Sequence, residues 1–273
     1  MASSTNGRTA TSRAVVAEAI LSLERAGVPT PRLDAELLIA EALGVDRGAL
    51  FAAPEQEVSE EVAETAAELL RRRCEREPVA YILGKKGFRW IELEVDPRVL
   101  IPRPETELLV EVALDLAQGA RVHEVGVGSG AVALAVKHER PDLRVSASDA
   151  SADALDVARR NAAALDLDVD LMEARDLPPG SYDLVLANMP YIREDEWDAL
   201  APELKLYEPP EAFLAGPDGL DAIRGLVGSA PSGTRLALEH DRAQAESVRR
   251  LLAEAESRRG LDGGEWVTAG LVP

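Results

Sequence analysis

The chain has 273 residues, of which 46% are hydrophobic, 4% aromatic and 29% charged, a composition typical of a folded protein with a sizeable core. Its 49 acidic residues outnumber 30 basic ones and give a formal net charge of −19, which argues against a duplex nucleic-acid binder because such a protein needs a basic surface to replace counterions. The single cysteine excludes an internal disulfide, and the three scattered histidines have no zinc-ligand spacing, so we expect no metal.

No segment of the sequence is typical of export or membrane insertion. Residues 1–13 are polar and rich in serine and threonine, without the apolar stretch of a secretory signal. No run approaches the roughly 18 apolar residues of a membrane span. We therefore expect a cytoplasmic protein that contacts no membrane and no nucleic acid directly, and we expect a monomer.

The first part of the chain is predicted to be helical. Apolar residues recur at helical spacing in residues 13–27, 33–44 and 59–76. Ser59 is expected to cap the third of these helices. We predict a small all-α domain over residues 1–84.

A connector of different character follows the helices. Residues 88–95 alternate like a strand, and Asp96-Pro97 is a turn signal. The prolines at 102 and 104 exclude a helix interior. We predict a β-hairpin and an extended arm over residues 85–104, and then a helix over 105–118.

The remaining chain, residues 105–273, alternates short apolar strands with helices. Strands are predicted at 121–125, 143–148, 169–172, 182–187, 234–239 and, more weakly, 266–269. Helices are predicted at 131–139, 152–165 and 241–259. This alternation predicts an α/β fold with a doubly wound, mostly parallel, Rossmann-like sheet.

A glycine-rich loop joins the first strand of this sheet to the following helix. It consists of Gly126, Val127, Gly128, Ser129 and Gly130. Glycine permits a tight turn and lets backbone N–H groups approach a ligand, and Asp149 ends the next strand, where a carboxylate can accept both hydroxyls of a ribose. From the loop alone, three interpretations remain open: a methyltransferase, a nicotinamide- or flavin-binding protein, and a merely structural turn.

Glu124 stands directly before the loop and favours the methyltransferase. A carboxylate at this position would repel a pyrophosphate, but it suits the cationic amino-acid and sulfonium end of S-adenosylmethionine. The structural alternative is a partly exposed glutamate at the end of a strand.

A second motif, Asn188-Met189-Pro190-Tyr191, follows the apolar strand at 182–187. Pro190 favours an extended Met189, so that the main-chain oxygen of Met189 can face the site. Together with the side-chain oxygen of Asn188, it can accept both N–H bonds of a substrate –NH₂ and align the nitrogen with a methyl donor. Tyr191 would pack on a planar amide. These four residues are the candidate catalytic and substrate-binding residues, and the alternative is a strand-ending Asx turn with a core tyrosine.

The second motif resembles the Asn-Pro-Pro-Tyr sequence of amino-methyltransferases that act on planar nitrogens. Residues 77–84, 98–107, 207–210 and 216–221 further resemble the HemK/PrmC-like N5-glutamine methyltransferases, which modify peptide-chain release factors in translation termination. The resemblance covers nearly the whole chain.

The resemblance implies a seven-stranded methyltransferase sheet, S-adenosylmethionine as the cofactor and a release factor as the substrate, methylated on the glutamine of its Gly-Gly-Gln tripeptide. It implies cofactor contacts at Glu124, Gly126, Val127, Gly128, Ser129, Gly130, Asp149, Asp176 and Asn188, and docking of the substrate on the helical domain. Met189 replaces the first proline of the family motif. This departure puts the reaction rate in doubt more than the assignment to the family. The alternatives are the same chemistry on a ribosomal-protein glutamine, a small molecule or DNA adenine, and a non-catalytic module of the same fold.

Overall fold

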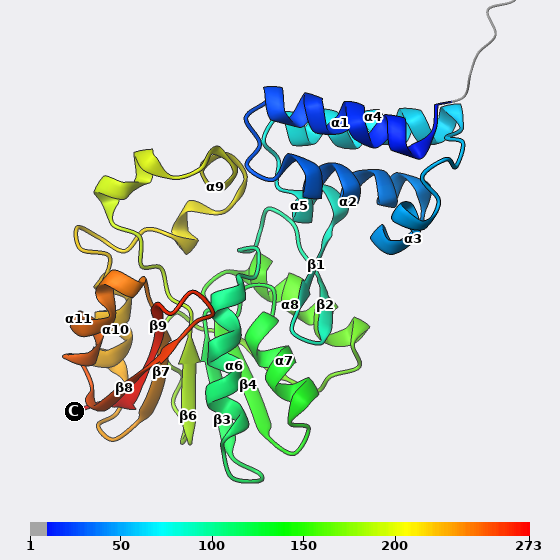
Figure 1. Ribbon diagram of the computed structural model, residues 1–273. Helices are drawn as coiled ribbons and strands as arrows, with labels where there is room; N and C mark the ends of the chain where they lie inside the picture. The colour runs from blue at the N-terminus through cyan, green and yellow to red at the C-terminus, as the bar shows by residue number, and fades with distance from the viewer. Residues whose placement is uncertain (1–9) are drawn as a thin grey trace, which may run out of the picture. The chain divides into compact units, whose positions relative to one another are not determined.

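The computed structural model describes residues 10–273, so most of the segment 1–13, in which we expect no secretory signal, lies outside the described residues. The chain divides after Leu83 into two compact units, and the hairpin that follows belongs to the second unit. No helix in the described part is long and apolar enough to cross a membrane. Each unit is described by itself below (Figure 1).

The first unit is entirely helical. It contains α1 (Ser12–Arg25), α2 (Pro31–Leu43), α3 (Arg47–Ala52), α4 (Glu60–Cys74) and α5 (Val79–Leu83). Ser59 caps α4 as predicted, because its Oγ accepts the Val62 N–H at 3.3 Å. A buried ion pair between Arg73 and Asp34 joins α4 to α2 at 2.7 Å. The predicted helices at 13–27, 33–44 and 59–76 are confirmed, whereas the short helices α3 and α5 were not expected.

The second unit begins with a hairpin of β1 (Lys85–Phe88) and β2 (Ile91–Glu94). Its turn lies at Arg89-Trp90 and not at Asp96-Pro97, so the prediction of one strand over 88–95 is wrong. The alternation of apolar residues suggested one continuous strand because Phe88 and Ile91 are both buried. In the structure they lie on either side of the turn and are paired with each other. The predicted helix at 105–118 is shorter in the structure, with the 3-10 turn η1 (Pro104–Thr106) and α6 (Glu107–Leu114).

A seven-stranded sheet forms the centre of the second unit, in the order β5-β4-β3-β6-β7-β9-β8. The strands are β3 (Arg121–Val125), β4 (Arg144–Asp149), β5 (Asp170–Glu173), β6 (Leu184–Ala187), β7 (Arg235–Glu239), β8 (Ala253–Arg259) and β9 (Glu265–Leu271). The neighbours among β3 to β7 are parallel, and β9 runs antiparallel to both β7 and β8. The predicted doubly wound, mostly parallel sheet is confirmed.

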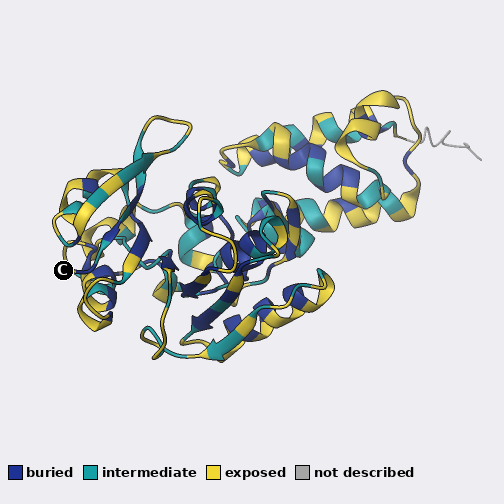
Figure 2. Ribbon diagram, turned by 90° about the horizontal axis from the view of Figure 1, so that it is seen from below, coloured by how far each residue is buried: buried dark blue, intermediate teal, exposed yellow. Residues whose placement is uncertain are grey.

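Helices cover both faces of this sheet. The helices α6, α7 (Ala131–Glu139) and α8 (Ala152–Ala164) bury Leu109, Leu134 and Leu155 on one face. On the other face, α10 (Asp221–Ser229) and α11 (Ala245–Arg249) bury Ile223 and Val248. Figure 2 shows the central strands as buried and the outer sides of the helices as exposed. With apolar cover on both faces, ligands can reach the sheet only at its ends.

The predicted helix over 241–259 is wrong in its second half. Helical turns end with η4 (Arg242–Gln244) and α11, and the chain then continues as β8. The β8 sequence Ala-Glu-Ala-Glu-Ser-Arg-Arg is rich in helix-forming residues, but its pairing with β9 overrides this weak local preference. Glu254 has a φ of +51° beside a register shift in this pair.

A folded segment that the sequence did not predict follows β6. It contains η2 (Glu194–Ala199), α9 (Pro202–Tyr207) and η3 (Pro210–Ala212). A parallel bridge between Ile192 and Leu214 joins its two ends. We call residues 192–214 the β6–α10 insertion.

Candidate active site

The two sequence motifs meet at the point where the strand order of the sheet reverses. Strands β3 and β6 are direct neighbours, with Val125 paired to Ala187, yet β3 leads on to β4 and β6 leads on to β7 in opposite directions along the sheet. In open α/β sheets this reversal leaves a crevice beyond the carboxyl ends of the strands, where ligands bind. Gly126 and Asn188 are the first residues beyond those two ends.

A cavity of about 500 Å³ occupies this crevice, a volume in the usual range for a small-molecule site. The predicted site residues that line it are Glu124, Gly126, Val127, Gly128, Ser129, Asp149, Asn188, Met189 and Pro190. The structure therefore brings the glycine loop, the strand-ending aspartate and most of the second motif to one cavity.

Three predicted residues do not line this cavity. Gly130 (φ +88°) instead allows close packing on α7, because a Cβ there would stand 2.8 Å from Leu134 Cδ1. Tyr191 directs its hydroxyl group towards Glu239. Asp176 is exposed, whereas its neighbour Arg175 lines the cavity, so a contact of Asp176 with the cofactor stays a prediction.

Backbone hydrogen bonds fix the shape of the glycine loop. The N–H groups of Gly126 and Val127 both donate to Ser148 O, at 2.8 and 3.0 Å. The Gly128 N–H donates to Asp149 Oδ2 at 3.0 Å, and Asp149 Oδ1 accepts the Ser151 N–H at 2.9 Å. The Asp149 carboxylate is thus held in place at the cavity wall, and each of its oxygens keeps a lone pair for a hydroxyl group.

Glu124 is buried at the floor of the cavity, with 3% of its surface exposed. Its Oε2 accepts the Ala133 N–H in the first turn of α7 at 2.8 Å. Burial raises the pKa of Glu124 well above its usual range; the Ala133 N–H lowers it, and the charge of Asp149 raises it further. The structural alternative of a partly exposed glutamate is therefore wrong. A cation in the cavity would stabilise the ionised form of Glu124.

The Asn188 carboxamide is anchored through its nitrogen. Its Nδ2 donates to Thr106 Oγ1 at 3.2 Å, whereas its Oδ1 accepts no hydrogen bond from residues 10–273. Asn188 and Met189 lie close to the glycine loop, since a Cβ on Gly126 would stand 3.9 Å from both Asn188 O and Met189 Sδ. Asn188, a residue of the cavity wall at the end of β6, thus has an amide oxygen without a partner in the described part of the chain.

Three residues that the sequence analysis did not select support this motif. Thr106 lines the cavity and anchors Asn188. Gln244 Nε2 donates to Tyr191 O at 2.9 Å and so holds the end of the motif. Glu239 ends β7 with no exposed surface, and its Oε1 accepts the Tyr191 O–H at 3.4 Å. An acidic residue ending a buried strand was the available signal for Glu239, since Glu124 and Asp149 are placed in the same way.

The extended arm before α6 is fixed over the cavity by a buried carboxylate. Glu208 Oε2 accepts the Ile101 N–H at 3.0 Å, and Glu208 Oε1 pairs with Arg103 Nη2 at 2.5 Å. Leu100 and Pro102 of this arm line the cavity. Glu208 thereby ties the arm to the β6–α10 insertion.

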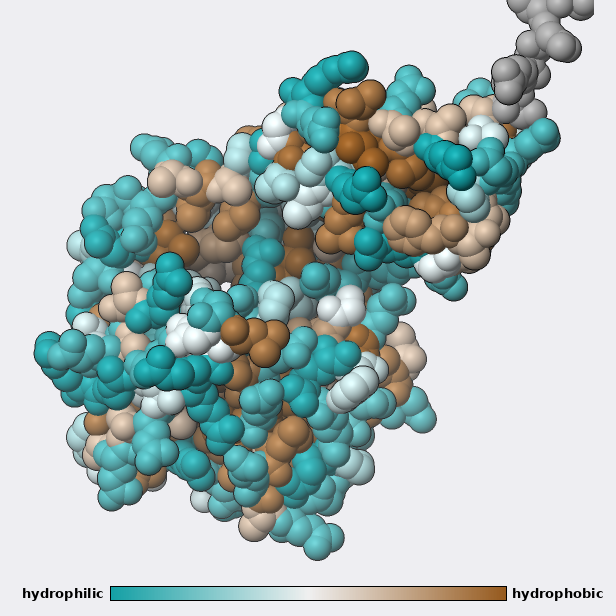
Figure 3. Space-filling model, in the orientation of Figure 1, coloured by the Kyte–Doolittle hydropathy of each residue, from teal (hydrophilic) through white to brown (hydrophobic). Residues whose placement is uncertain are grey.

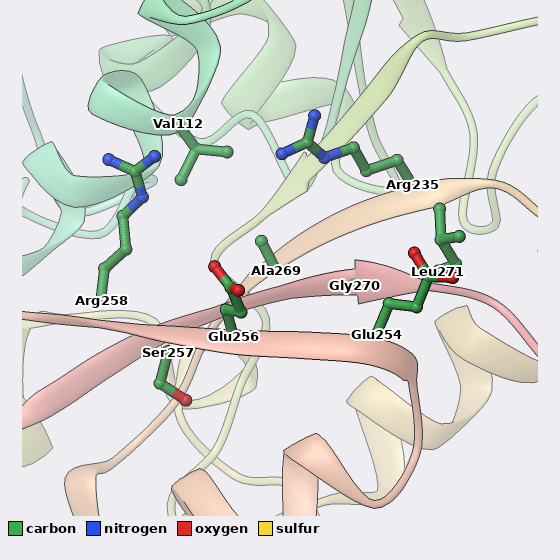
Figure 4. A pocket seen from close by; sticks show the side chains of 9 residues that line it. All are labelled: Val112, Arg235, Glu254, Glu256, Ser257, Arg258, Ala269, Gly270 and Leu271. Atoms are coloured by element: carbon green, nitrogen blue, oxygen red, sulfur yellow. The ribbon is translucent and has the colours of Figure 1, made fainter.

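A second hollow, of about 360 Å³, lies beside the β8–β9 edge of the sheet (Figure 4). It mixes Arg235 and Arg258 with Glu254 and Glu256 and contains none of the predicted site residues. Within residues 10–273, no group of three or more histidine, cysteine, aspartate and glutamate side chains is placed to hold a metal ion.

The first unit has an apolar hollow of its own, of about 260 Å³, between α1, α2 and α3. Phe51 and Ile20 contribute to its lining, and 55% of the surface of Phe51 is exposed. Apolar side chains are visible at the surface of this unit in Figure 3.

Comparisons with protein families match both units. A family model described as the PrmC N-terminal domain matches residues 14–84, and one described as the methyltransferase small domain matches residues 104–204. Among solved structures, the catalytic domain of hMettl16 in complex with an MAT2A 3′UTR hairpin superposes with a TM-score of 0.53 and 14% identity, over 74% of this chain and 81% of that chain. At this identity the likeness shows the fold alone.

Curated relatives are similar over most of the chain. The release factor glutamine methyltransferase of Streptomyces coelicolor is 41% identical over 86% of this chain and 86% of its own length. The enzymes of the same name from Xylella fastidiosa (strain Temecula1) and Deinococcus radiodurans are 39% and 36% identical, over 89% and 93% of this chain and 94% and 95% of their own lengths. The chain belongs to the family of release factor glutamine methyltransferases.

Proposed function

We propose that this protein transfers the methyl group of S-adenosylmethionine to the side-chain amide nitrogen of the glutamine in the Gly-Gly-Gln tripeptide of a peptide-chain release factor. The observation that carries the proposal is the carboxamide of the cavity residue Asn188, whose nitrogen is engaged by Thr106 while its oxygen has no partner among residues 10–273. A free oxygen at this position is the acceptor that a substrate –NH₂ requires.

The cavity residues fit S-adenosylmethionine. Asp149 offers two fixed carboxylate oxygens to the ribose hydroxyls. Glu124 is a buried carboxyl group with no paired cation among residues 10–273, and the positive amino-acid and sulfonium end of the cofactor would supply one. When bound, S-adenosylmethionine supplies an electrophilic methyl group.

Asn188 and Met189 perform the alignment. An amide nitrogen is a poor nucleophile because its lone pair is delocalised into the carbonyl group. Asn188 Oδ1 and the main-chain oxygen of Met189 accept the two N–H bonds of the substrate and hold the nitrogen in line with the methyl group. As positive charge develops on the nitrogen, these two oxygens stabilise it. The product nitrogen then loses one proton to solvent.

The release factor as substrate is supported by the names of the relatives. We assign docking of this substrate to the helical unit, residues 1–84, and catalysis to residues 105–273, with residues 85–104 as the connector. Because release factors act in translation termination, we propose that the enzyme works in the cytoplasm. A monomeric state stays a prediction.

Mass spectrometry of a purified release factor after incubation with this protein and S-adenosylmethionine tests the proposal. We expect one added methyl group on the glutamine of Gly-Gly-Gln, and none when that glutamine is replaced by alanine. No methylation in the presence of measurable cofactor binding would contradict the release factor as substrate and favour another amide or amine.

A further inference from the structure

The buried carboxyl group of Glu239 is incompletely satisfied. Its side chain has no exposed surface, and its Oε1 accepts the Tyr191 O–H at a long distance of 3.4 Å. Its Oε2 has no hydrogen-bond partner among residues 10–273. A buried polar atom without a partner lowers the stability of the fold, which suggests that Glu239 has a function.

Glu239 stands next to the residue that anchors Asn188. Strands β6 and β7 pair Ala187 with Leu238, so Asn188 and Glu239 are the next residues of each strand. Thr106 is itself buried and acts on both residues: its Oγ1 accepts the Asn188 Nδ2–H at 3.2 Å, and a side-chain hydrogen bond from Thr106 lowers the pKa of Glu239. A hydroxyl group carries only one hydrogen. With Asn188 donating to Thr106, that hydrogen is free to point at Glu239.

We propose that Glu239 is a positioning residue which, through the hydroxyl group of Thr106, keeps the Asn188 carboxamide turned so that its oxygen faces the substrate nitrogen. The inference rests on the proposed function for its catalytic consequence. Glu239 acts through Thr106 and Asn188 and does not itself touch the substrate.

The need for such a device follows from the shape of an amide. The oxygen and the NH₂ group of a carboxamide are nearly equal in size, so packing alone does not select one orientation. A carboxylate can only accept hydrogen bonds, so Thr106 must donate to Glu239 and Asn188 must donate to Thr106. We call these two hydrogen bonds the series Asn188, Thr106, Glu239, and they run in a single direction. If that direction were reversed, Asn188 would present its NH₂ group to the NH₂ group of the substrate, and two donors would face each other.

The charge state of Glu239 links this series to pH. Burial raises the pKa of Glu239 to about 7. The groups that act on it from the neighbouring elements are Thr106, Glu105, Tyr191 and Arg103. Above this pKa the carboxylate accepts from Thr106, whereas below it the carboxyl group can itself donate and the single direction is lost.

The substitution Glu239→Gln is the direct test, because glutamine keeps the shape but can donate to Thr106 and so permits the reversed series. We expect kcat to fall about 100-fold, the loss typical of one misdirected charge-stabilising group, with the KM for S-adenosylmethionine within about threefold of wild type. The rise of kcat through pH 7 should be absent from the variant. The matched control is Glu256→Gln, which removes one exposed carboxylate from β8 and should leave kcat and its pH profile unchanged.

Thr106 supplies a second, independent pair of variants. Thr106→Val removes the hydroxyl group at nearly constant volume, and Thr106→Ser retains it. We expect the valine variant to lose about as much kcat as Glu239→Gln and the serine variant to stay within about threefold of wild type. The double variant Thr106→Val/Glu239→Gln should be no slower than either single one, because both interrupt the same series.

A measurement that does not depend on turnover completes the test. We expect the Asn188 side-chain NH₂ signal in NMR, assigned with Asn188→Asp, to exchange with solvent at least about tenfold faster in Thr106→Val and Glu239→Gln than in wild type. Unchanged exchange in both variants, or unchanged kcat in both, would overturn the inference. A protected Asn188 NH₂ group in a wild-type protein that methylates no release factor would contradict the proposed function and leave the positioning of Asn188 intact.

Discussion

The two halves of the crevice hold their polar residues by different means. Beyond β3 and β4, Glu124 and Asp149 accept backbone N–H groups at 2.8 to 3.0 Å. Beyond β6 and β7, Asn188 and Glu239 depend on side-chain hydroxyl groups, at 3.2 and 3.4 Å. Both buried glutamates have raised pKa values, but only Glu124 has a short hydrogen bond.

This difference matches the tasks proposed for the two halves. Backbone N–H groups are present whatever the side chain, so their hydrogen bonds suit the binding of a cofactor that is always the same. Side-chain groups can be aimed individually, so they suit the alignment of a reacting atom. Substitutions beyond β3 and β4 should therefore act on cofactor affinity, and substitutions beyond β6 and β7 on kcat.

Asn188→Ala should have the largest effect. Removing one oriented acceptor of developing charge typically costs about 10²–10³ in kcat, whereas the KM for the cofactor should change far less. Steady-state kinetics with a release factor measure both. Turnover equal to wild type would show that Asn188 does not align the substrate.

The pH dependence of stability should separate the two glutamates. Because the pKa of Glu239 is raised to about 7 in the folded protein from 4.5, the folded state holds this proton where the unfolded state releases it. The contribution of this group to the free energy of unfolding is then largest below pH 4.5 and is lost, by on the order of 3 kcal/mol, as the pH rises through 7. In Glu239→Gln this part of the fall should vanish while the part from Glu124 remains. Urea unfolding of the wild type and of Glu239→Gln between pH 4 and 8 measures this difference. If the free energy of unfolding changes with pH in the same way in both proteins, the prediction is refuted.

Glu124→Gln should act on the cofactor alone. A hydrogen bond to a charged group is worth about 1.5–3 kcal/mol, so we expect the Kd for S-adenosylmethionine to rise about 10- to 100-fold by calorimetry. At saturating cofactor kcat should approach that of wild type. A fall in kcat with unchanged Kd would reverse the assignment of the two halves.

Met189→Pro should have the smallest effect. The contact expected from this position is a main-chain oxygen, which proline also has, so kcat should stay within about tenfold of wild type. Loss of all methylation by this variant would show that the main-chain acceptor is misassigned.

The fold was largely predictable because its strands are short apolar runs between helices. The strand β8 was not, since its alternating alanine and glutamate favour a helix and only the pairing with β9 makes it extended. The β6–α10 insertion has no periodic pattern at all, and the bridge from Ile192 to Leu214 that closes it depends on distant residues.

The site was predictable where one short stretch of sequence carries it, as in the glycine loop and in residues 188–190, all of which contribute to the cavity apart from Gly130. Thr106 and Glu239 were not predicted because their contacts form only when folding brings η1, β6 and β7 together. Thr106 then contacts Asn188, and Glu239 contacts Tyr191. The position of Glu239 at the end of a buried strand was an available signal, but spacing in the sequence does not show its contact with Tyr191 or the contact of Thr106 with Asn188.

The closed ends of the β6–α10 insertion have a consequence for how this enzyme can change. Since Ile192 and Leu214 lie side by side, the chain leaves and re-enters the domain at one place, and the residues between, apart from Glu208 with its contacts to the arm, can be exchanged or lengthened without shifting the register of β6 and β7. The insertion also contributes Pro209 and Ala212 to the cavity wall. Changes in this insertion can therefore alter the substrate preference while the residues proposed for methyl transfer stay the same.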